Sequence, residues 1–339
     1  MAWRSLVRSM EAGARRAELA TRRRSRTSEI AKRQYEREKA RFERRKAKLH
    51  AAERAADDVQ RFEQYLRAIV ELHKDCIDEW DWQDIASSQQ PPPPALATET
   101  ERAAQQELDG YKPGLFARIF GRGPKQVSEL TQAVEIARLA DARENTELLN
   151  RYREVVTTWD IERRIAKLVL AKDPAGYREA LDYVDVLGEF GDFGSKASVA
   201  SADPNIVVID YALTNDETVP REELELSITG KLLSKAMPAA RHSELLQKHV
   251  CSAALRIARD VFNIIPVERM IVNVARTHSN SPAGHPVTDT IFSAMFFRRI
   301  LNQFNLQAVD PVDTIRNFMH RMSFQKAGGF EPIAPLTES

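Results

Sequence analysis

The chain has 339 residues, of which 29% are charged and 43% hydrophobic, and its formal net charge at pH 7 is +1. This length is sufficient for two domains of ordinary size. No apolar run approaches the roughly 20 residues that a membrane-spanning helix requires. The two cysteines, Cys76 and Cys251, cannot form a disulfide framework. A transmembrane protein and a disulfide-stabilised secreted domain are therefore excluded, and we expect a cytoplasmic protein.

The near-zero net charge conceals a strongly basic segment. Arg22–Arg54 contains 14 Lys and Arg residues against five Glu, a formal charge of +9 that leaves −8 for the rest of the chain. Dense Lys and Arg are sufficient to contact nucleic-acid phosphates and release their counterions. Nucleic acid is therefore the predicted partner of this segment, although interleaved Glu residues weaken the pattern and no stacking aromatics accompany it. The predicted contact residues are Arg22, Arg23, Arg24, Arg26, Arg37, Arg41, Arg44, Arg45 and Lys48.

The same segment belongs to a long predicted helix, from Glu11 to about Glu79, which contains no proline and is rich in Ala, Arg, Lys and Glu. One heptad position is apolar throughout: Tyr35, Phe42, Leu49 and Ala56. The companion position starts with charged residues and becomes apolar only later, so the coiled-coil pattern is incomplete. It predicts self-association through this helix. An apolar stripe from Phe62 to Trp80 predicts packing against the rest of the protein.

The first residues form a separate amphipathic pattern. Trp3, Leu6, Val7 and Met10 fall on one face of a short predicted helix, with arginines mostly elsewhere. Such a face suits a membrane surface or the groove of a partner. Packing on another helix of the same assembly is the simpler alternative.

The middle of the chain begins with a proline-rich segment. Gln89–Thr98 includes four consecutive prolines, which favour an extended polyproline spacer. Helices are expected after it at Glu99–Leu108, Pro124–Ala140, Glu144–Ala171 and Pro174–Leu187. Asp173 is placed to cap the last of these, with Pro174 at its first position.

The sequence pattern of the C-terminal part is typical of an α+β domain. Strands are expected at Ile206–Leu213, Leu224–Thr229, Arg269–Thr277 and Val287–Phe297, and a polar turn between the first two predicts a hairpin. A long helix is expected at Ala240–Ile264, and short helices at Arg298–Asn305 and Pro311–Met322. Strands before and after one long helix predict an α+β fold, with a mixed sheet packed on that helix. The predicted domains are a basic helical arm (1–88), a linker (89–98), a helical region (99–187) and the α+β domain (188–339).

One arrangement in the predicted strand pair resembles a metal-dependent nuclease site. Restriction-type nucleases place an Asp at the end of one strand and a Glu-x-Lys triplet on the next, which together bind a metal and activate water. Asp210 and Glu225 would take the acidic roles, with Lys231 assisting. Ser227 stands where the lysine of the triplet should be, so the motif is incomplete.

Other candidate motifs favour structural roles. The glycines Gly188, Gly191 and Gly194 lie after a predicted helix and before a strand, the reverse of a phosphate-binding loop. His242 and His249 share a helix with Cys251, but no further ligand pattern supports a metal site. We therefore expect no metal and no cofactor.

Basic residues also gather near the C-terminus. Arg316 and His320 would lie one turn apart on a predicted helix and share a face. A phosphate or an acidic partner could bind there, and a solvated helix face is the alternative. The residues of this predicted anion or partner face are Arg298, Arg299, Arg316, His320 and Arg321.

From Val219 to Phe330 the chain resembles a group of uncharacterised bacterial proteins. The similar segments are Val219-Pro220, Leu226 to Lys231, Met237 to Arg241, Val250-Cys251, Leu255 to Arg259, Ile265 to Val267, Asp310-Pro311, Asn317 to Met322 and Gly329-Phe330. This resemblance implies a bacterial, cytoplasmic origin and one domain type, but no activity.

Taken together, the patterns favour a non-enzymatic interaction protein whose basic arm binds nucleic acid, and they identify no protein partner. A metal-dependent nuclease and attachment to a membrane surface through Trp3–Met10 are the alternatives.

Overall fold

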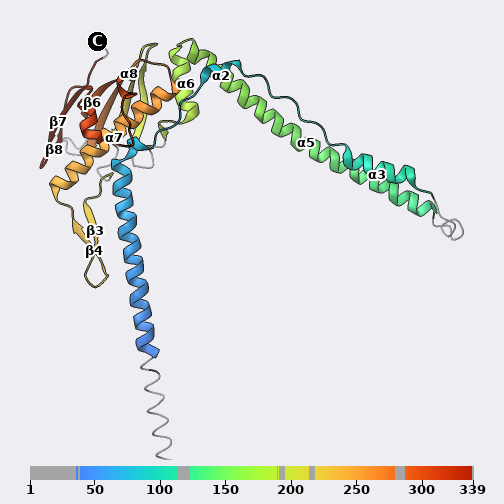
Figure 1. Cartoon of the computed structure of the whole chain (residues 1–339), viewed down its shortest axis with the longest axis horizontal. Helices are drawn as coiled ribbons and strands as arrows, with labels where there is room; N and C mark the ends of the chain where they lie inside the picture. The colour runs from blue at the N-terminus through green and yellow to red at the C-terminus, as the bar shows by residue number, and fades with distance from the viewer. Residues whose placement is uncertain are drawn as a thin grey trace, which may run out of the picture. The chain divides into compact units, whose positions relative to one another are not determined.

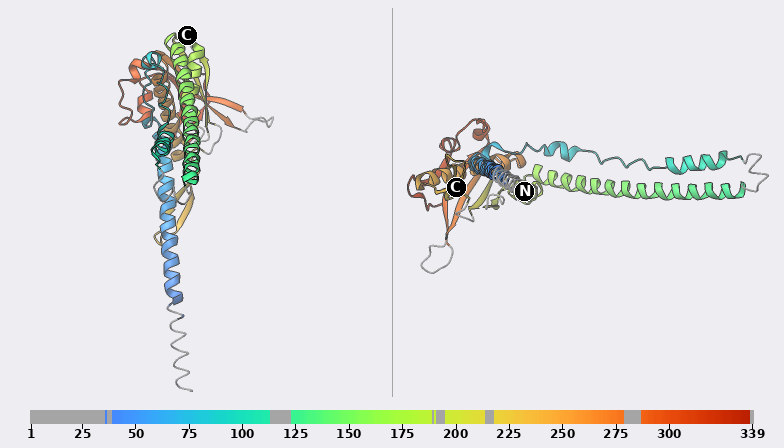
Figure 2. Two further views of the ribbon diagram at one scale, coloured as in Figure 1. Left: turned by 90° about the vertical axis from the view of Figure 1, so that its right-hand side faces the viewer. Right: turned by 90° about the horizontal axis from the view of Figure 1, so that it is seen from below.

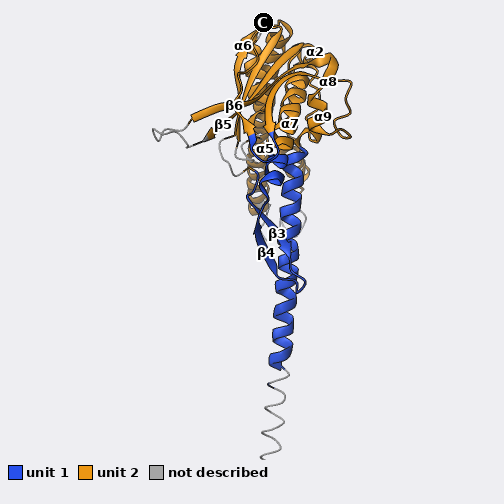
Figure 3. Ribbon diagram, turned by 90° about the vertical axis from the view of Figure 1, so that its left-hand side faces the viewer, with its two compact units in different colours: residues 1–71, 219–246, 325–329 blue, residues 72–218, 247–324, 330–339 orange. Residues whose placement is uncertain are grey.

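A computed structural model of the chain describes residues 36, 39–112, 123–188, 190, 195–213, 218–278 and 287–337 (Figure 1). Trp3–Met10, Arg22–Arg26 and Arg37 lie outside these described residues. The chain divides into two compact units, each built from segments that are distant in sequence (Figure 3). Residues 1–71, 219–246 and 325–329 belong to the first unit, and residues 72–218, 247–324 and 330–339 to the second. These divisions differ from the boundaries predicted near residues 88 and 188.

The first unit combines a helix with a small hairpin. The helix, here called the basic helix, covers residues 39–70, where strong helix formers follow one another without glycine or proline. The hairpin consists of β3 (Glu222–Leu226) and β4 (Leu232–Ala236), which pair antiparallel. Its turn, residues 227–231, includes Gly230 at φ +73°. Glycine adopts this left-handed conformation without steric cost.

The second unit contains a six-stranded sheet in the order β1-β2-β5-β6-β7-β8. Its strands are β1 (Ser195–Ala202), β2 (Ile206–Leu213), β5 (Arg269–His278), β6 (Val287–Phe297), β7 (Met319–Gln325) and β8 (Gly329–Glu331). β2 and β5 run parallel, whereas β1 with β2, β5 with β6 and β6 with β7 pair antiparallel. The mixed sheet confirms the predicted α+β class.

One long helix, α7 (Ala239–Ile264), covers a face of this sheet (Figure 1). Its side chains from His249 to Ala258 are all buried. The Nε2 atom of His249 lies 3.0 Å from the hydroxyl of Tyr211 on β2, which fixes the helix against the sheet. This packing confirms the arrangement that the alternation of strands and one long helix predicted.

The helical part of the second unit comprises α2 (Trp82–Ser87), α3 (Glu99–Gly110), α5 (Gly123–Leu170) and α6 (Pro174–Val184). The helices predicted at 124–140 and 144–171 are in fact one helix, because neither glycine nor proline interrupts α5 between them. Figure 2 shows α3 beside α5. Asp141 on α5 joins the two, since its Oδ2 accepts the backbone N–H of Glu101 at 2.9 Å.

The proline-rich segment is extended, as predicted, but it is not a free spacer. The indole N–H of Trp159 donates to Ser88 Oγ at 2.8 Å, and the hydroxyl of Tyr152 donates to the carbonyl of Pro91 at 3.1 Å. Asn145 bonds both backbone groups of Ala97, at 2.7 and 2.9 Å. The side chains of α5 therefore fix this segment along the helix.

The predicted pairing of the strands at 206–213 and 224–229 is wrong. β2 lies between β1 and β5 in the large sheet, whereas β3 pairs with β4 in a separate sheet. The reason is burial. Ile206, Ile209 and Tyr211 show that β2 is buried, so its backbone N–H and C=O groups need hydrogen-bonding strands along both edges, whereas β3 is largely exposed.

The predicted helix at Pro311–Met322 is only partly helical. α9 (Pro311–Ile315) begins at the N-cap Asp310, whose carboxylate accepts the backbone N–H groups of Val312 and Asp313. The chain then enters β7, where Met319 pairs with Met295 of β6. The preceding short helix, α8 (Arg298–Leu301), lies within the predicted range.

The basic helix ends at residue 70, earlier than the predicted end near Glu79. A 3-10 turn, η1 (Leu72–Lys74), follows it. Beyond that turn, Asp260 on α7 accepts the backbone N–H of Ile77 at 3.0 Å, and the indole of Trp82 donates to the carbonyl of Ile264. The contact at Ile77 holds the chain against α7 where the predicted helix would have continued, and Trp82 begins the separate helix α2.

Candidate functional site

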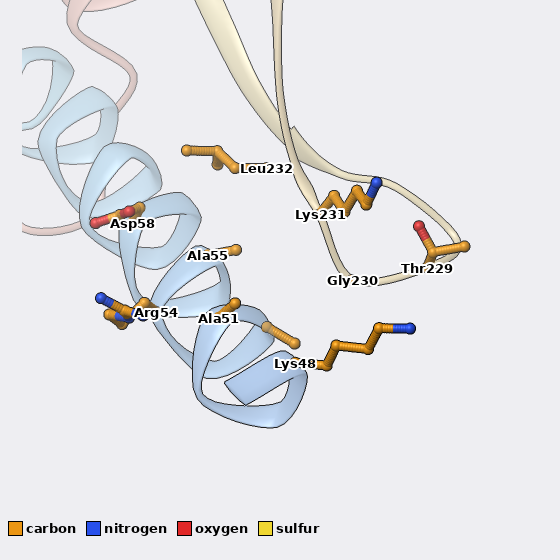
Figure 4. A pocket seen from close by; sticks show the side chains of 10 residues that line it. Lys48, Ala51, Arg54, Ala55, Asp58, Thr229, Gly230, Lys231 and Leu232 are labelled. Carbon is orange, nitrogen blue, oxygen red and sulfur yellow. The ribbon is translucent and has the colours of Figure 1, made fainter. Parts of the chain in front are cut away.

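An open groove of about 670 Å³ lies in the first unit, between the basic helix and the turn of the hairpin (Figure 4). Its lining consists of three cations, one carboxylate and small or aliphatic residues. The residues are Lys48, Ala51, Ala52, Arg54, Ala55, Asp58, Thr229, Gly230, Lys231 and Leu232.

Small side chains allow the hairpin to approach the helix. Ala51, Ala52 and Ala55 share a helix face by their spacing, and Ala55 is buried. A Cβ added to Gly230 would lie only 3.2 Å from the Cβ of Ala52. The groove therefore has an apolar floor, with longer charged side chains at its edges.

The cations at the edges have little compensating charge. Among the described residues, no carboxylate forms an ion pair with the ammonium group of Lys48 or Lys231. Asp58, the only acidic residue of the lining, is paired with Arg61 at 2.9 Å. Figure 4 shows Lys48 extending from the helix toward the turn of the hairpin, and Lys231 extending from the hairpin itself. The groove therefore favours an anionic ligand.

The predicted nucleic-acid residues continue this charge along the helix. Residues 39–48 are all exposed and contain six Lys and Arg residues against Glu43 alone. Arg41, Arg44, Arg45 and Lys48 lie in this stretch. These ten residues have a net charge of +5 and span about 15 Å of the helix axis, at 1.5 Å per residue. The helix therefore carries one net positive charge per about 3 Å. Double-stranded DNA carries one phosphate per about 1.7 Å, so the two charge densities are comparable.

The residues of the nuclease hypothesis belong to different sheets. Asp210 lies on β2 in the second unit, where Asn273 donates to its carboxylate at 3.0 Å. Glu225 on β3 is paired with Lys235, and Lys231 lines the groove of the first unit. The strand pair on which the hypothesis depended does not form. In the described part of the chain, no cluster of three or more His, Cys, Asp or Glu residues is placed to hold a metal ion.

The predicted basic face near the C-terminus does not lie on one helix. Arg316 and His320 do not share a helix, because α9 ends before Arg316 and His320 lies on β7. Arg316 is paired with Asp313 at 3.0 Å. The Nδ1 atom of His320 lies 2.9 Å from the carbonyl of Phe318. Arg321 donates to the carbonyls of residues 334 and 335.

Arg298, another member of that set, has a structural role. Its guanidinium donates to the carbonyls of Val267 and Ile265 and lies 5.1 Å from the ring centre of Phe262. Burial lowers the pKa of Arg298 below its usual value. Its neighbour Arg299 is exposed.

Neither cysteine is suited to nucleophilic catalysis. Burial raises the pKa of the Cys76 thiol to about 12 and also raises the pKa of Cys251, which is fully buried. A thiolate is the reactive form, so both groups remain protonated near neutral pH.

The sequence did not indicate that the hairpin contributes to the basic site. Lys231 was predicted to assist a nuclease, and Arg54 was not distinguished from other cations of its segment. Two local signals point to the groove: the alanines at 51, 52 and 55, and a glycine between two short alternating strands. Either signal alone is common in proteins, so neither identifies the contact.

Searches of protein-family models, curated proteins and solved structures find no match to this chain. Among the residues that the structure describes, no helix is both long and apolar enough to cross a membrane.

Proposed function

We propose that this protein is a non-enzymatic nucleic-acid-binding protein that contacts the phosphate backbone with its basic helix and groove. The observation that carries this proposal is the groove itself. Lys48 and Lys231 lie far apart in the sequence, yet both line one open groove, and no described carboxylate pairs with either.

The arrangement supports backbone contacts rather than base recognition. Phosphate contacts need only cations at a suitable density, and they position a protein without reading sequence. The exposed residues 39–48 supply such cations, and the groove adds Arg54 from the basic helix and Lys231 from the hairpin. The proposed ligand is therefore any nucleic acid with an accessible backbone, and binding should weaken as salt increases.

Charge reversal in the groove tests the proposal. The double variant Lys48→Glu/Lys231→Glu should bind labelled duplex DNA at least about tenfold more weakly at 0.1 M salt. The magnitude of the slope of the logarithm of the association constant against the logarithm of the salt concentration should also fall by about 2. Fluorescence anisotropy with the full-length protein, over a salt series, measures both quantities. Single-stranded RNA serves as a second probe.

A matched control is available on α5. Lys125→Glu/Lys167→Glu changes the net charge by the same amount at exposed positions outside the groove. It should leave the affinity nearly unchanged. An equal loss in both double variants would show a general charge effect and contradict the groove, and no binding by the wild type at low salt would end the proposal.

A further inference from the structure

The tip of the hairpin presents an apolar side chain directly to solvent. Ile228 lies in the turn between β3 and β4, and its side chain is fully exposed. Leu226 and Leu232, which pair at the end of the ribbon, are also partly exposed, at 44% and 40%. Single exposed apolar residues are common on protein surfaces, so exposure alone does not indicate a role.

The position of Ile228 is well defined by the turn. The Ser227 hydroxyl accepts the backbone N–H of Lys231 at 2.9 Å and lies 3.0 Å from the Thr229 hydroxyl. Backbone bonds from Gly230 to Ser227 and from Ser227 to Lys231 close the turn, at 2.9 and 2.8 Å. Four contacts over five residues hold the tip in one conformation, so Ile228 projects as a fixed feature.

Cations accompany this apolar tip. Lys231 is three residues from Ile228, and Lys48 extends from the basic helix beside the turn (Figure 4). An apolar apex with cations beside it combines two features of proteins that deform DNA. Such proteins insert Ile, Leu, Phe or Met between base pairs and hold the flanking phosphates with Lys or Arg.

We propose that the hairpin tip enters a groove of duplex nucleic acid and inserts Ile228 between adjacent base pairs. Lys48 and Lys231 would then contact the phosphates on either side of the unstacked step. The inference rests on the proposed function and adds a duplex substrate to it. Pyrimidine–purine steps such as TA unstack most easily, so they should be preferred sites of insertion.

The test uses full-length protein and a duplex with 2-aminopurine at a central TA step, because the fluorescence of this base rises when it unstacks. Saturating wild type should raise the fluorescence severalfold. Ile228→Ser should abolish the rise, whereas Ile228→Leu should retain it. Since the phosphate contacts remain, anisotropy should show that Ile228→Ser loses less than about tenfold in affinity.

Leu233→Ser is the matched control, because Leu233 is an exposed leucine on the strand of the same hairpin. It should leave the fluorescence rise intact. Binding by the wild type without any rise would overturn the insertion while leaving the proposed function in place. Absence of binding to both the duplex and single-stranded RNA, with Ile228-dependent binding to phosphatidylserine vesicles instead, would overturn both and assign the tip to a lipid surface.

Discussion

Asp141 shows how a single carboxylate in the middle of one helix can stabilise another helix. It is buried on α5, and its Oδ2 accepts the backbone N–H of Glu101 in the first turn of α3. The N-cap of α3, Thr98, makes no side-chain capping bond of its own. Asp141 therefore caps α3 from outside, and the bond from Glu101, with a second from Thr100, lowers its pKa below 3.8.

The lowered pKa predicts a pH-dependent stability. A carboxyl group whose pKa is lower in the folded state stabilises that state fully above its unfolded pKa, near 3.8, and the contribution is lost as pH falls through the folded pKa. Asp141→Asn should therefore be less stable than the wild type at pH 7, with a smaller difference at pH 3. Urea unfolding at both pH values measures this, and an equal difference at both would contradict it.

At the scale of elements, the contact between α5 and α6 depends on the absence of a side chain at Gly176. A Cβ at this buried position would lie 2.4 Å from the Cβ of Leu168 on α5, far inside contact distance. Gly176→Ala should destabilise the protein by about 1–3 kcal/mol, because the helices must move apart. The better helix propensity of alanine offsets this by no more than about 1 kcal/mol.

Gly110, at the end of α3, is the matched control for that substitution. A Cβ added to Gly110 meets no atom within 4 Å. Gly110→Ala should leave the free energy of unfolding unchanged or slightly increased, and both variants can be compared by urea unfolding. A loss in Gly110→Ala as large as in Gly176→Ala would show that backbone conformation, not the contact with Leu168, determines the effect.

At the scale of the whole molecule, we propose that the basic helix also self-associates. Phe42 and Leu49 are seven residues apart on it and 65% and 60% exposed. Paired helices would bury these residues but would also bring like charges together, so screening should favour the pair. Sedimentation velocity should show more dimer at 0.5 M than at 0.05 M salt, as screening increases.

Phe42→Ser/Leu49→Ser should remain monomeric under both conditions. The control is Ile136→Ser/Leu139→Ser, which removes two similarly exposed apolar residues from α5. A wild type that is monomeric at both salt concentrations would contradict self-association. Loss of the dimer in the control alone would assign it to α5.

Several elements were predictable because their signals are local. Asp173 and Pro174 mark the start of α6, and the structure confirms the cap, with the Asp173 carboxylate 2.8 Å from the backbone nitrogen of Ala175. The strand at 287–297 has the predicted bounds, and α7 begins within one residue of its prediction. Caps and hydrophobic periodicity depend on residues a few positions apart, so the sequence displays them directly.

The candidate site was only half predictable. The cations from Arg41 to Lys48 are visible as a dense basic run, and the structure shows that they are exposed. Their meeting with Lys231 was not visible, because it depends on the close approach of Gly230 to Ala52. Small residues permit such an approach in many proteins, and nothing in their local sequence specifies which segment will make it.

The sequence by itself determined the class of the fold, the basic helix, α7 and four of the eight described strands (β2, β3, β5 and β6), because these follow from propensity and periodicity along a short stretch. Only the tertiary structure decided that β2 pairs with β1 and β5, and that residues 319–322 form a strand where the sequence predicts a helix. It also decided that a proline-rich segment is fixed along α5 and that Lys48 and Lys231 share a groove. These outcomes depend on burial and hydrogen bonds between segments distant in the chain, which override local preference.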